Sequence, residues 1–258
     1  ARAERWLEQM LETGIEADVI SYSTLIHACA KSSDLRRAEG WMARMQEAGV
    51  LGNVVTYNCL INACARAGDG PRAEEWLSRM QDVGLHPCVL TYNSVINACA
   101  KAGDVARAEK WLTEMKKRGV QPDSVSYSTV IHGCVKSHEL PRSEGWLAAM
   151  RAAGEPPSQF CYDTVIQACT HSGHTAKAER WLDEALSAGL TPCPGSFTTL
   201  INRCSRAGEL DKAEKWLLRM EEAGLDAAAP CQAVAAAWSR QGCEARGARL
   251  LERSAKVH

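Results

Sequence analysis

The chain has 258 residues, of which 46% are hydrophobic and 24% charged, and its formal net charge is −1. A total so close to zero excludes a global electrostatic attraction to nucleic acid or to membrane surfaces. No apolar run approaches the roughly 18 consecutive residues that a membrane-spanning helix requires. The first residues, ARAERWLEQM, already show a repeated pattern, so no targeting peptide is visible.

Tryptophan recurs with a fixed step of 35 residues, and a row of aromatic residues keeps the same step. Self-similarity at a period of about 20–50 residues is typical of a solenoid, in which each unit contacts only its neighbours. The period therefore predicts an array of stacked units rather than domains with separate cores. The two rows are Trp6, Trp41, Trp76, Trp111, Trp146, Trp181 and Trp216, and Tyr22, Tyr57, Tyr92, Tyr127, Tyr162 and Phe197.

The unit at residues 89–123 predicts two helices joined by a short turn. Apolar residues in VLTYNSVINACAKAG fall three and four positions apart, as on one face of an amphipathic helix. Gly103 marks the end of this helix, and Asp104 is suited to cap the N-terminus of the next. The second helix places Trp111 and Met115 on one face. Each helix is expected to have about 13 residues and a length of roughly 20 Å.

Stacking of these hairpins would bury faces that a single hairpin leaves bare. We interpret the tryptophan row as core packing rather than a cofactor site. A glutamate row stands beside a basic row, and we expect a solvated face on which charge pairs link neighbouring helices weakly. The rows are Glu39, Glu74, Glu109, Glu144, Glu179 and Glu214, and Arg37, Arg72, Arg107, Arg142, Lys177 and Lys212.

The chain is predicted to divide into one incomplete unit, six full units and a degenerate final unit. Residues 1–18 hold only a second helix, whose apolar face would lack a partner. In the last unit Leu251 replaces the tryptophan and Gln232 the aromatic residue, as expected of a degenerate capping repeat. The units are 1–18, 19–53, 54–88, 89–123, 124–158, 159–193, 194–228 and 229–258.

Cysteine is frequent, with 12 residues, but its pattern does not favour disulfides or metal binding. One cysteine per unit on an apolar helix face is typical of a small buried hydrophobic residue. No CxxC pair occurs, so a zinc cluster is not expected. We therefore expect a reducing compartment and no metal or other cofactor. The periodic cysteines are Cys29, Cys64, Cys99, Cys134, Cys169 and Cys204.

The 35-residue unit resembles the pentatricopeptide repeat, notably in VLTYNSVINACAKAGDVARAEKWLTEMKKRGVQPD at residues 89–123. The tetratricopeptide repeat is a rival, but its period is about 34 residues and its helix pattern differs. The resemblance implies an all-α, right-handed α-solenoid that binds single-stranded RNA, with each repeat contacting one base through two or three side chains. It also implies a mitochondrial or plastid protein that acts in RNA processing, stability, editing or translation.

By this resemblance, each repeat carries two base-reading residues. One follows the aromatic residue of the first helix, and the other is the last residue of the unit. Six positions in register favour recognition, although a single Ser or Asn near a helix start is more often a local cap. The predicted reading pairs are Ser23 with Asn53, Asn58 with Cys88, Asn93 with Asp123, Ser128 with Ser158, Asp163 with Cys193, and Thr198 with Ala228.

The resemblance further implies that Asn93 with Asp123 selects uracil, and that Ser23 with Asn53 selects adenine. Along RNA running 5′ to 3′ the site would be adenine, pyrimidine, uracil, an uncertain purine, an unread base and a purine. Apolar residues two positions before the aromatic row are expected to wedge between bases; Gly195 is the exception. The predicted stacking residues are Ile20, Val55, Leu90, Val125 and Phe160.

A basic residue ends each first helix and suggests one phosphate contact per unit. The alternative is a cation that stabilises the helix dipole, which contributes about 0.3–1 kcal/mol, and both roles can hold together. The predicted phosphate contacts are Lys31, Arg66, Lys101, Lys136, His171 and Arg206.

Two functions remain open from the sequence. The first is a sequence-selective binder of single-stranded RNA. The second is a protein-binding scaffold, such as a subunit of an organellar ribosome, because the concave face of a solenoid suits both kinds of partner. The sequence has no paired acid and base, no nucleophile with a histidine partner and no glycine-rich phosphate loop, so no enzyme activity is expected.

Overall fold

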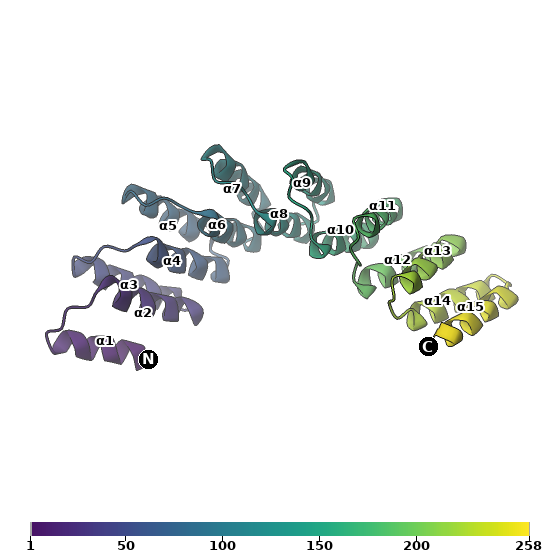
Figure 1. Ribbon diagram of the computed structural model, residues 1–258, viewed down its shortest axis with the longest axis horizontal. Coiled ribbons are helices and arrows are strands. Elements are labelled where there is room, and N and C mark those ends of the chain that lie inside the picture. Colours follow the sequence, from purple (N-terminus) through teal and green to yellow (C-terminus); the bar gives the residue numbers. More distant parts are fainter. Residues whose placement is uncertain (1, 258) are drawn as a thin grey trace. The chain divides into compact units, whose positions relative to one another are not determined.

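The computed structural model describes the backbone of residues 2–257 and the side chains of residues 4–253 (Figure 1). Over this range the chain forms fifteen α-helices and no strand. They belong to two compact units, residues 1–137 and 138–258. The first unit contains α1 (Arg2–Glu12), α2 (Val19–Lys31), α3 (Leu35–Glu47), α4 (Val54–Ala67), α5 (Gly70–Asp82), α6 (Val89–Lys101), α7 (Val105–Lys117) and α8 (Ser124–Lys136). The second contains α9 (Leu140–Ala152), α10 (Gln159–His171), α11 (Thr175–Ser187), α12 (Pro194–Arg206), α13 (Leu210–Glu222), α14 (Ala228–Arg240) and α15 (Glu244–Val257).

The helix boundaries follow the local signals of the sequence. The Asp104 carboxylate accepts a hydrogen bond from the Arg107 amide at 3.0 Å and so caps α7, as predicted. Gly103, with φ +80°, ends the turn before it in the left-handed conformation. Both helices of residues 89–123 have 13 residues, which confirms the expected length.

Within each unit the hairpins stack as an α-solenoid with two layers of helices. First helices contact one another directly, as α2, α4, α6 and α8 do in the first unit and α10, α12 and α14 do in the second. Where both helices of a hairpin belong to the same unit, the first helix also contacts the second, as α6 contacts α7. The core lies between these layers, where the aromatic row from Tyr22 to Phe197 is at most 2% exposed.

The periodic cysteines are buried, and all twelve cysteines are free thiols. Burial raises the pKa of the thiols of Cys64, Cys99 and Cys169 to about 12. These side chains therefore remain protonated at neutral pH, as expected of small hydrophobic core residues.

The glutamate row is less solvated than predicted, because it is bonded to the tryptophans. Four glutamates of this row, and Glu4 before it, accept a hydrogen bond from the indole Nε1 of the tryptophan 37 residues later, as Glu144 does from Trp181 at 3.0 Å. Lys177, from the same helix as Trp181, pairs with Glu144 at 2.6 Å, and the glutamate side chain is only 13% exposed. We call this series the Glu–Trp ladder. Its other rungs are Glu4–Trp41, Glu39–Trp76, Glu74–Trp111 and Glu179–Trp216.

The first helix and the last hairpin depart from the regular pattern. Trp6 on α1 is 65% exposed and borders an apolar groove of about 820 Å³ between α1 and α2. At the other end, Leu251 stands where a tryptophan would bond to Glu214, and the buried Oε2 of Glu214 instead lies 3.4 Å from Nε of Arg246. None of the described helices is both long and apolar enough to cross a membrane.

Candidate functional site

The predicted reading residues fall at two kinds of place in the first-helix layer. The first member of each pair lies in the first turns of a first helix, directly after the buried aromatic residue. The second member caps the next first helix in five of the six pairs, as Asp123 caps α8. The exception is Ala228, which lies inside α14, whose N-cap is Ala227. The register of the last pair is thus shifted by one residue.

Asn93 and Asp123 form a direct contact across a repeat junction. The Asn93 side chain donates from Nδ2 to Oδ1 of Asp123 at 3.0 Å. The Ser126 hydroxyl, one turn into α8, lies 2.5 Å from Oδ1 of Asn93 and 2.9 Å from Oδ1 of Asp123. A single hydroxyl therefore touches both members of the pair.

The same bridge recurs with a step of 33 residues from the first reading residue. Thr56 contacts Ser23 at 2.7 Å and the Asn53 side chain at 3.1 Å. We name Thr56, Thr91, Ser126 and Ser196 the hydroxyl row; each is 0% exposed. The remaining bridges are Thr91 with Asn58 at 2.7 Å and Cys88 at 3.4 Å, and Ser196 with Asp163 at 2.6 Å and Cys193 at 3.4 Å.

The environment of Asp123 favours its charged form. Burial alone would raise the pKa of its carboxyl group, but hydrogen bonds from the Ser126 amide and from the Asn93 and Ser126 side chains lower it further than burial raises it. The pKa therefore lies below its usual value, and Asp123 is an acceptor-only carboxylate at neutral pH.

Two pairs lack the bridging hydroxyl. Ser128 bonds back to the Ser124 carbonyl of its own helix at 2.5 Å. Ser158 caps α10, where the equivalent of the hydroxyl row is Cys161, 3.4 Å from the Ser158 hydroxyl. For the pair of Thr198 and Ala228, the equivalent residue is Cys231, whose thiol contacts the Leu250 carbonyl instead. Local capping, the alternative considered from the sequence, thus describes part of what Ser128 and Ser158 do.

The five predicted stacking residues form an exposed apolar row. Each lies in the first turn of a first helix, three positions before a reading residue, so the two side chains are neighbours on the helix surface. Large apolar side chains rarely stay exposed at equivalent places in successive units without a partner. Their exposed fractions are 69% for Ile20, 60% for Val55, 59% for Leu90, 56% for Val125 and 56% for Phe160.

The six predicted phosphate contacts are exposed at the other end of the first helices. Five of the six follow a stacking residue by 11 positions, about three helical turns, so they lie on the same face about 16 Å further along; Arg206 follows Gly195 by the same step. Arg66 also donates to the Lys31 carbonyl at 3.0 Å and so covers the end of α2. No carboxylate of the described residues pairs with any of the six: Lys31, Arg66, Lys101, Lys136, His171 and Arg206.

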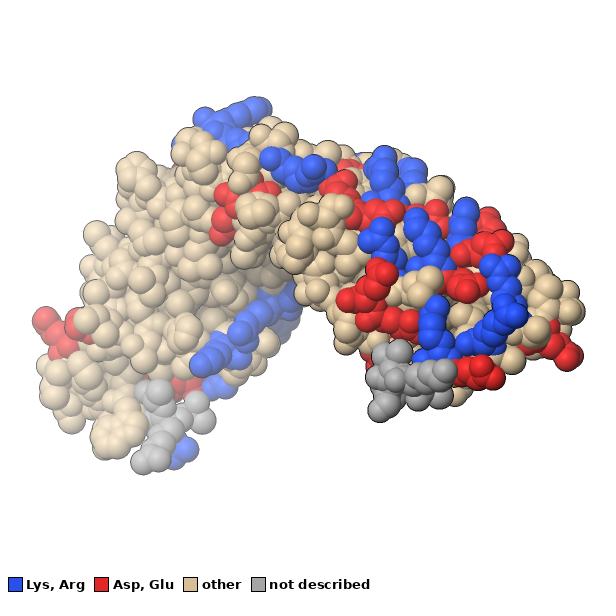
Figure 2. Space-filling model, turned by 45° about the vertical axis from the view of Figure 1, so that its right-hand side comes forward, with Lys and Arg blue, Asp and Glu red and all other residues tan. Residues whose placement is uncertain are grey.

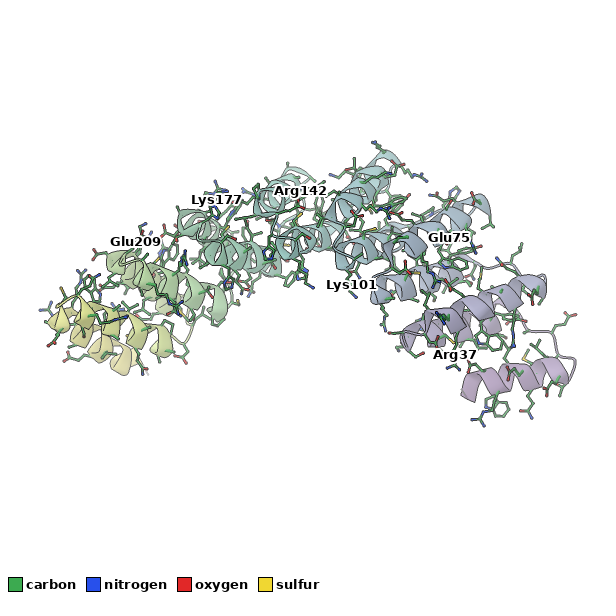
Figure 3. The ribbon with its side chains drawn as sticks, turned by 180° about the vertical axis from the view of Figure 1, so that it is seen from behind. Arg37, Glu75, Lys101, Arg142, Lys177 and Glu209 are labelled. Atoms are coloured by element: carbon green, nitrogen blue, oxygen red, sulfur yellow. The ribbon has the colours of Figure 1, made fainter. Side chains whose placement is uncertain are left out.

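The basic row on the second helices behaves differently. All six of its members, from Arg37 to Lys212, lie within ion-pair distance of a carboxylate. Figure 2 shows cations interleaved with carboxylates over the helices of the second unit that face the viewer. Figure 3 marks Arg37 and Lys177 on second helices and Lys101 at the end of a first helix. The six cations that end the first helices thus differ from this row of second-helix cations in having no carboxylate partner among the described residues.

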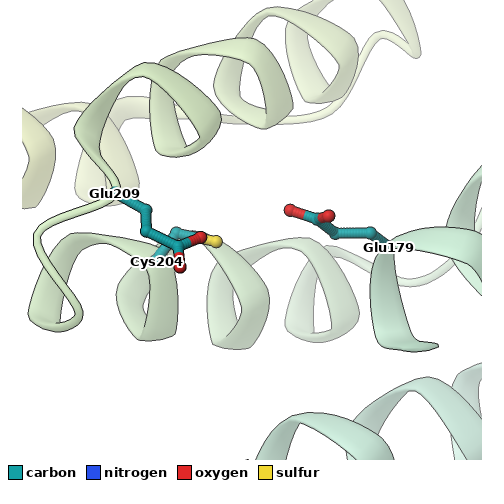
Figure 4. A group of neighbouring side chains, drawn as sticks. All are labelled: Glu179, Cys204 and Glu209. Atoms are coloured by element: carbon teal, nitrogen blue, oxygen red, sulfur yellow. The ribbon is translucent and has the colours of Figure 1, made fainter. Parts of the chain in front are cut away.

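Glu179, Cys204 and Glu209 bring three possible metal ligands together in the second unit (Figure 4). Burial raises the pKa of the Cys204 thiol to about 11, and Glu209 is engaged by Lys212 at 2.7 Å. The cysteine–glutamate contact itself recurs along the array, at 3.8 Å for Cys99 with Glu74. We interpret this group as part of the packing between repeats rather than as a metal centre.

The hydroxyl row was missed in the sequence analysis, although its signal is present. A hydroxyl residue precedes the aromatic row in the segments TYN at residues 56–58 and 91–93 and in SYS at residues 126–128. Its significance depends on the reading residue of the preceding repeat, which is distant in sequence. The period alone does not show that the two side chains meet.

The fold and site define a class: an α-solenoid of helical hairpins whose first helices present apolar, polar and basic side chains in register. The chain belongs to the pentatricopeptide repeat family. The model described as "PPR repeat family" matches residues 87–136, and "Pentatricopeptide repeat domain" matches residues 5–67 and 44–102. "PPR repeat" matches residues 125–155, 160–190 and 195–225. No curated protein sequence matches the chain.

Solved structures of this fold are similar to the chain. The maize pentatricopeptide repeat protein PPR10 in complex with an 18-nt psaJ RNA element is 22% identical, with a TM-score of 0.50 over 96% of this chain and 42% of that one. The PPR domain of Arabidopsis thaliana protein-only RNase P 1 in complex with tRNA is 17% identical, with a TM-score of 0.58; the match covers 74% of this chain and 94% of that one. Arabidopsis thaliana nuclear protein-only RNase P 2 is 18% identical, with a TM-score of 0.61; the match covers 77% of this chain and 42% of that one. The chain thus spans less than half the length of PPR10, and at these identities the likeness shows the fold.

Proposed function

We propose that the protein binds single-stranded RNA along its first-helix face, with about one base per repeat. The observation that carries this proposal is the row of five apolar side chains that remain 56–69% exposed at the same place in successive repeats. Bases have apolar faces, and stacking on protein side chains is the common way in which single-stranded RNA is held. The reading residues are one helical turn away, where they can reach the edge of a stacked base.

Electrostatics support the same face. The row of second-helix cations from Arg37 to Lys212 is paired with carboxylates, whereas the cations that end the first helices have no carboxylate partner among the described residues. A strand of RNA would therefore be attracted to the first-helix face, although the net charge of the chain is only −1. The helix-end cations lie far enough from the reading residues to contact the strand rather than the base.

The proposed site is adenine, pyrimidine, uracil, an uncertain purine, an unread base and a purine, from the repeat of Ser23 to that of Thr198. Membership of the family supports an organellar protein, in mitochondria or plastids, that acts in RNA processing, stability, editing or translation. The two RNA complexes among the similar structures support RNA as the partner. We propose binding rather than catalysis, with no cofactor.

The first test is competitive binding to oligonucleotides that differ only at the third base. Asn93→Thr should shift the preference there from uracil toward guanine and leave the other five positions unchanged. Asn97→Thr is the matched control, because it makes the same change one turn further along α6. If wild type and Asn93→Thr rank the four bases identically, Asn93 does not read RNA, and a protein-binding scaffold becomes the better interpretation.

The second test concerns the helix-end cations. Lys101→Ala should weaken binding to all RNA sequences alike and reduce the slope of log affinity against log salt by about 0.7, the value per phosphate contact for single strands. Lys110→Ala, on the second helix α7, should leave the slope unchanged. Equal slopes for wild type and Lys101→Ala would show that Lys101 only stabilises the end of its helix.

A further inference from the structure

The hydroxyl row lies where it can control the reading residues without touching RNA. Ser126 is 0% exposed, so a base on the surface would not reach its hydroxyl. It nevertheless lies 2.5 Å from the reading amide of Asn93 and 2.9 Å from the carboxylate of Asp123. Its position in α8 means that the repeat after Asn93 supplies this contact.

These contacts use part of the hydrogen-bonding capacity of Asn93. A side-chain amide has two N–H donors and two acceptor lone pairs. One donor is taken by Oδ1 of Asp123, and one lone pair of Oδ1 by the Ser126 hydroxyl. One N–H and one lone pair remain for a base.

The same contacts determine which way the amide faces. Asp123 can only accept, so Nδ2 of Asn93 must point toward it. The Ser126 hydroxyl holds Oδ1 from the other side at 2.5 Å. A rotation of the amide by 180° would bring its oxygen against the Asp123 carboxylate and lose that hydrogen bond, and the Ser126 hydroxyl would have to accept from Nδ2 instead of donating to Oδ1.

We propose that the hydroxyl row consists of positioning residues that set which atoms of the preceding repeat's reading side chain face the RNA. This inference rests on the proposed function. The unit of recognition then has three residues: the reading residue, the helix cap that follows it and the buried hydroxyl between them. In the pairs of Ser128 and Thr198 the equivalent residues are Cys161 and Cys231, which carry a thiol in place of the hydroxyl.

The chemistry of the pyrimidines shows what this orientation decides. On its Watson–Crick edge uracil offers an N–H donor between two carbonyl acceptors, whereas cytosine offers a ring nitrogen acceptor beside an amino donor. A side-chain amide can pair with either base, but with its oxygen and nitrogen exchanged. An amide held in one orientation therefore separates uracil from cytosine, and a freely rotating amide does so poorly.

The experiment measures the ratio of uracil to cytosine affinity at the third base, with the ratio at the second base as an internal reference. Ser126→Ala should lower the third-base ratio by about threefold to tenfold, the effect of one hydrogen bond, and leave the second-base ratio unchanged. Ser126→Thr should keep the wild-type ratio, because threonine serves at this place in Thr56 and Thr91. Thr129→Ala removes another hydroxyl from α8, one that bonds only to the Val125 carbonyl, and should have no effect on the ratio.

An unchanged third-base ratio in Ser126→Ala would overturn the inference while leaving base reading by Asn93 intact. An equal fall in Ser126→Ala and Ser126→Thr would also overturn it, because packing rather than the hydroxyl would be responsible. Failure of the proposed function has a different signature: the wild-type protein itself would not distinguish uracil from cytosine at the third base.

Discussion

At the scale of single residues, Glu144 shows how the array uses a charge in its interior. Its carboxylate receives the Lys177 ammonium and the Trp181 indole, both from the next repeat. Burial alone would raise the pKa of Glu144, but these hydrogen bonds and the Lys177 charge outweigh burial, so the pKa is lowered. A carboxyl group with a lowered pKa stabilises the fold in its ionised form.

The lowered pKa of Glu144 predicts a defined dependence of stability on pH. Its contribution is complete above the pKa of an unfolded glutamate, about 4.3, and is lost as pH falls through the lower pKa of the folded state. Glu144→Gln should reduce the free energy of unfolding by about 1–2 kcal/mol at pH 7, and the difference from wild type should shrink below about pH 4.3. Urea unfolding at pH values from 7 to 3 measures the loss at pH 7 and its dependence on pH. As a control, Glu75→Gln replaces an exposed carboxylate and should change the free energy of unfolding little. A difference that grows toward pH 3 would contradict the assignment.

At the scale of elements, the turn between the two helices of each hairpin has one residue in the left-handed conformation. Gly68, Gly103, Gly173, Gly208 and Gly242 occupy it in five hairpins. In the other two, Ser33 and His138 adopt φ of 60°, where a side chain is strained. The helices form at these two sites because stacking outweighs the local cost.

Replacing these two residues should therefore stabilise the protein. Ser33→Gly and His138→Gly should each raise the free energy of unfolding by about 0.5–1 kcal/mol, because glycine adopts the left-handed conformation without strain. Gly103→Ala is the reciprocal control and should lower stability by a similar amount, since its φ is +80°. Thermal melting of the three variants tests these changes in stability. A lower melting temperature for both glycine variants would show that the turns carry no strain.

The helices and their boundaries could be predicted because their causes are local: apolar spacing, an Asp cap and a glycine at the turn. The contacts between repeats could not, although each residue involved belongs to a visible row. A period of 35 residues is compatible with any offset between neighbouring helices. In the structure, contacting residues of neighbouring repeats are separated by two residues fewer or two residues more than the period of 35. The separation is 33 residues from Asn93 to Ser126 and 37 from Glu144 to Trp181. Only packing of the helices determines this offset, so the hydroxyl row and the Glu–Trp ladder emerged from the structure.

At the scale of the whole molecule, stability should be distributed along the array rather than concentrated in one core. Within each of the two units, hairpins contact their neighbours and no distant hairpin among the described residues. In such an array the free energy is approximately a sum of terms for units and for junctions between neighbours. Damage at one junction is thus expected to remain local.

Trp216→Ala tests this distribution. The indole is 1% exposed and bonds to Glu179 at 3.3 Å, so its removal should cost about 3–5 kcal/mol. Hydrogen exchange should become faster in α11 to α14 and stay unchanged in α2 to α5. Trp6→Ala serves as the control, because that indole is 65% exposed and its loss should have little effect on exchange. Loss of protection throughout residues 2–257 would mean that the molecule unfolds as one cooperative body.

The Glu–Trp ladder also makes the protein its own optical reporter. Each ladder tryptophan bridges two repeats, so parting of a junction would take its indole from an apolar contact with a carboxylate partner into water, and its emission would shift to longer wavelength. Trp6, already 65% exposed, gives the solvent-exposed signal for comparison. Retaining one ladder tryptophan at a time, with phenylalanine at every other tryptophan of the chain, including Trp6, Trp146 and Trp238, would place a single fluorophore at a chosen junction. The order in which the junctions separate under denaturant, or tighten when a strand binds, would then be observable without an attached dye.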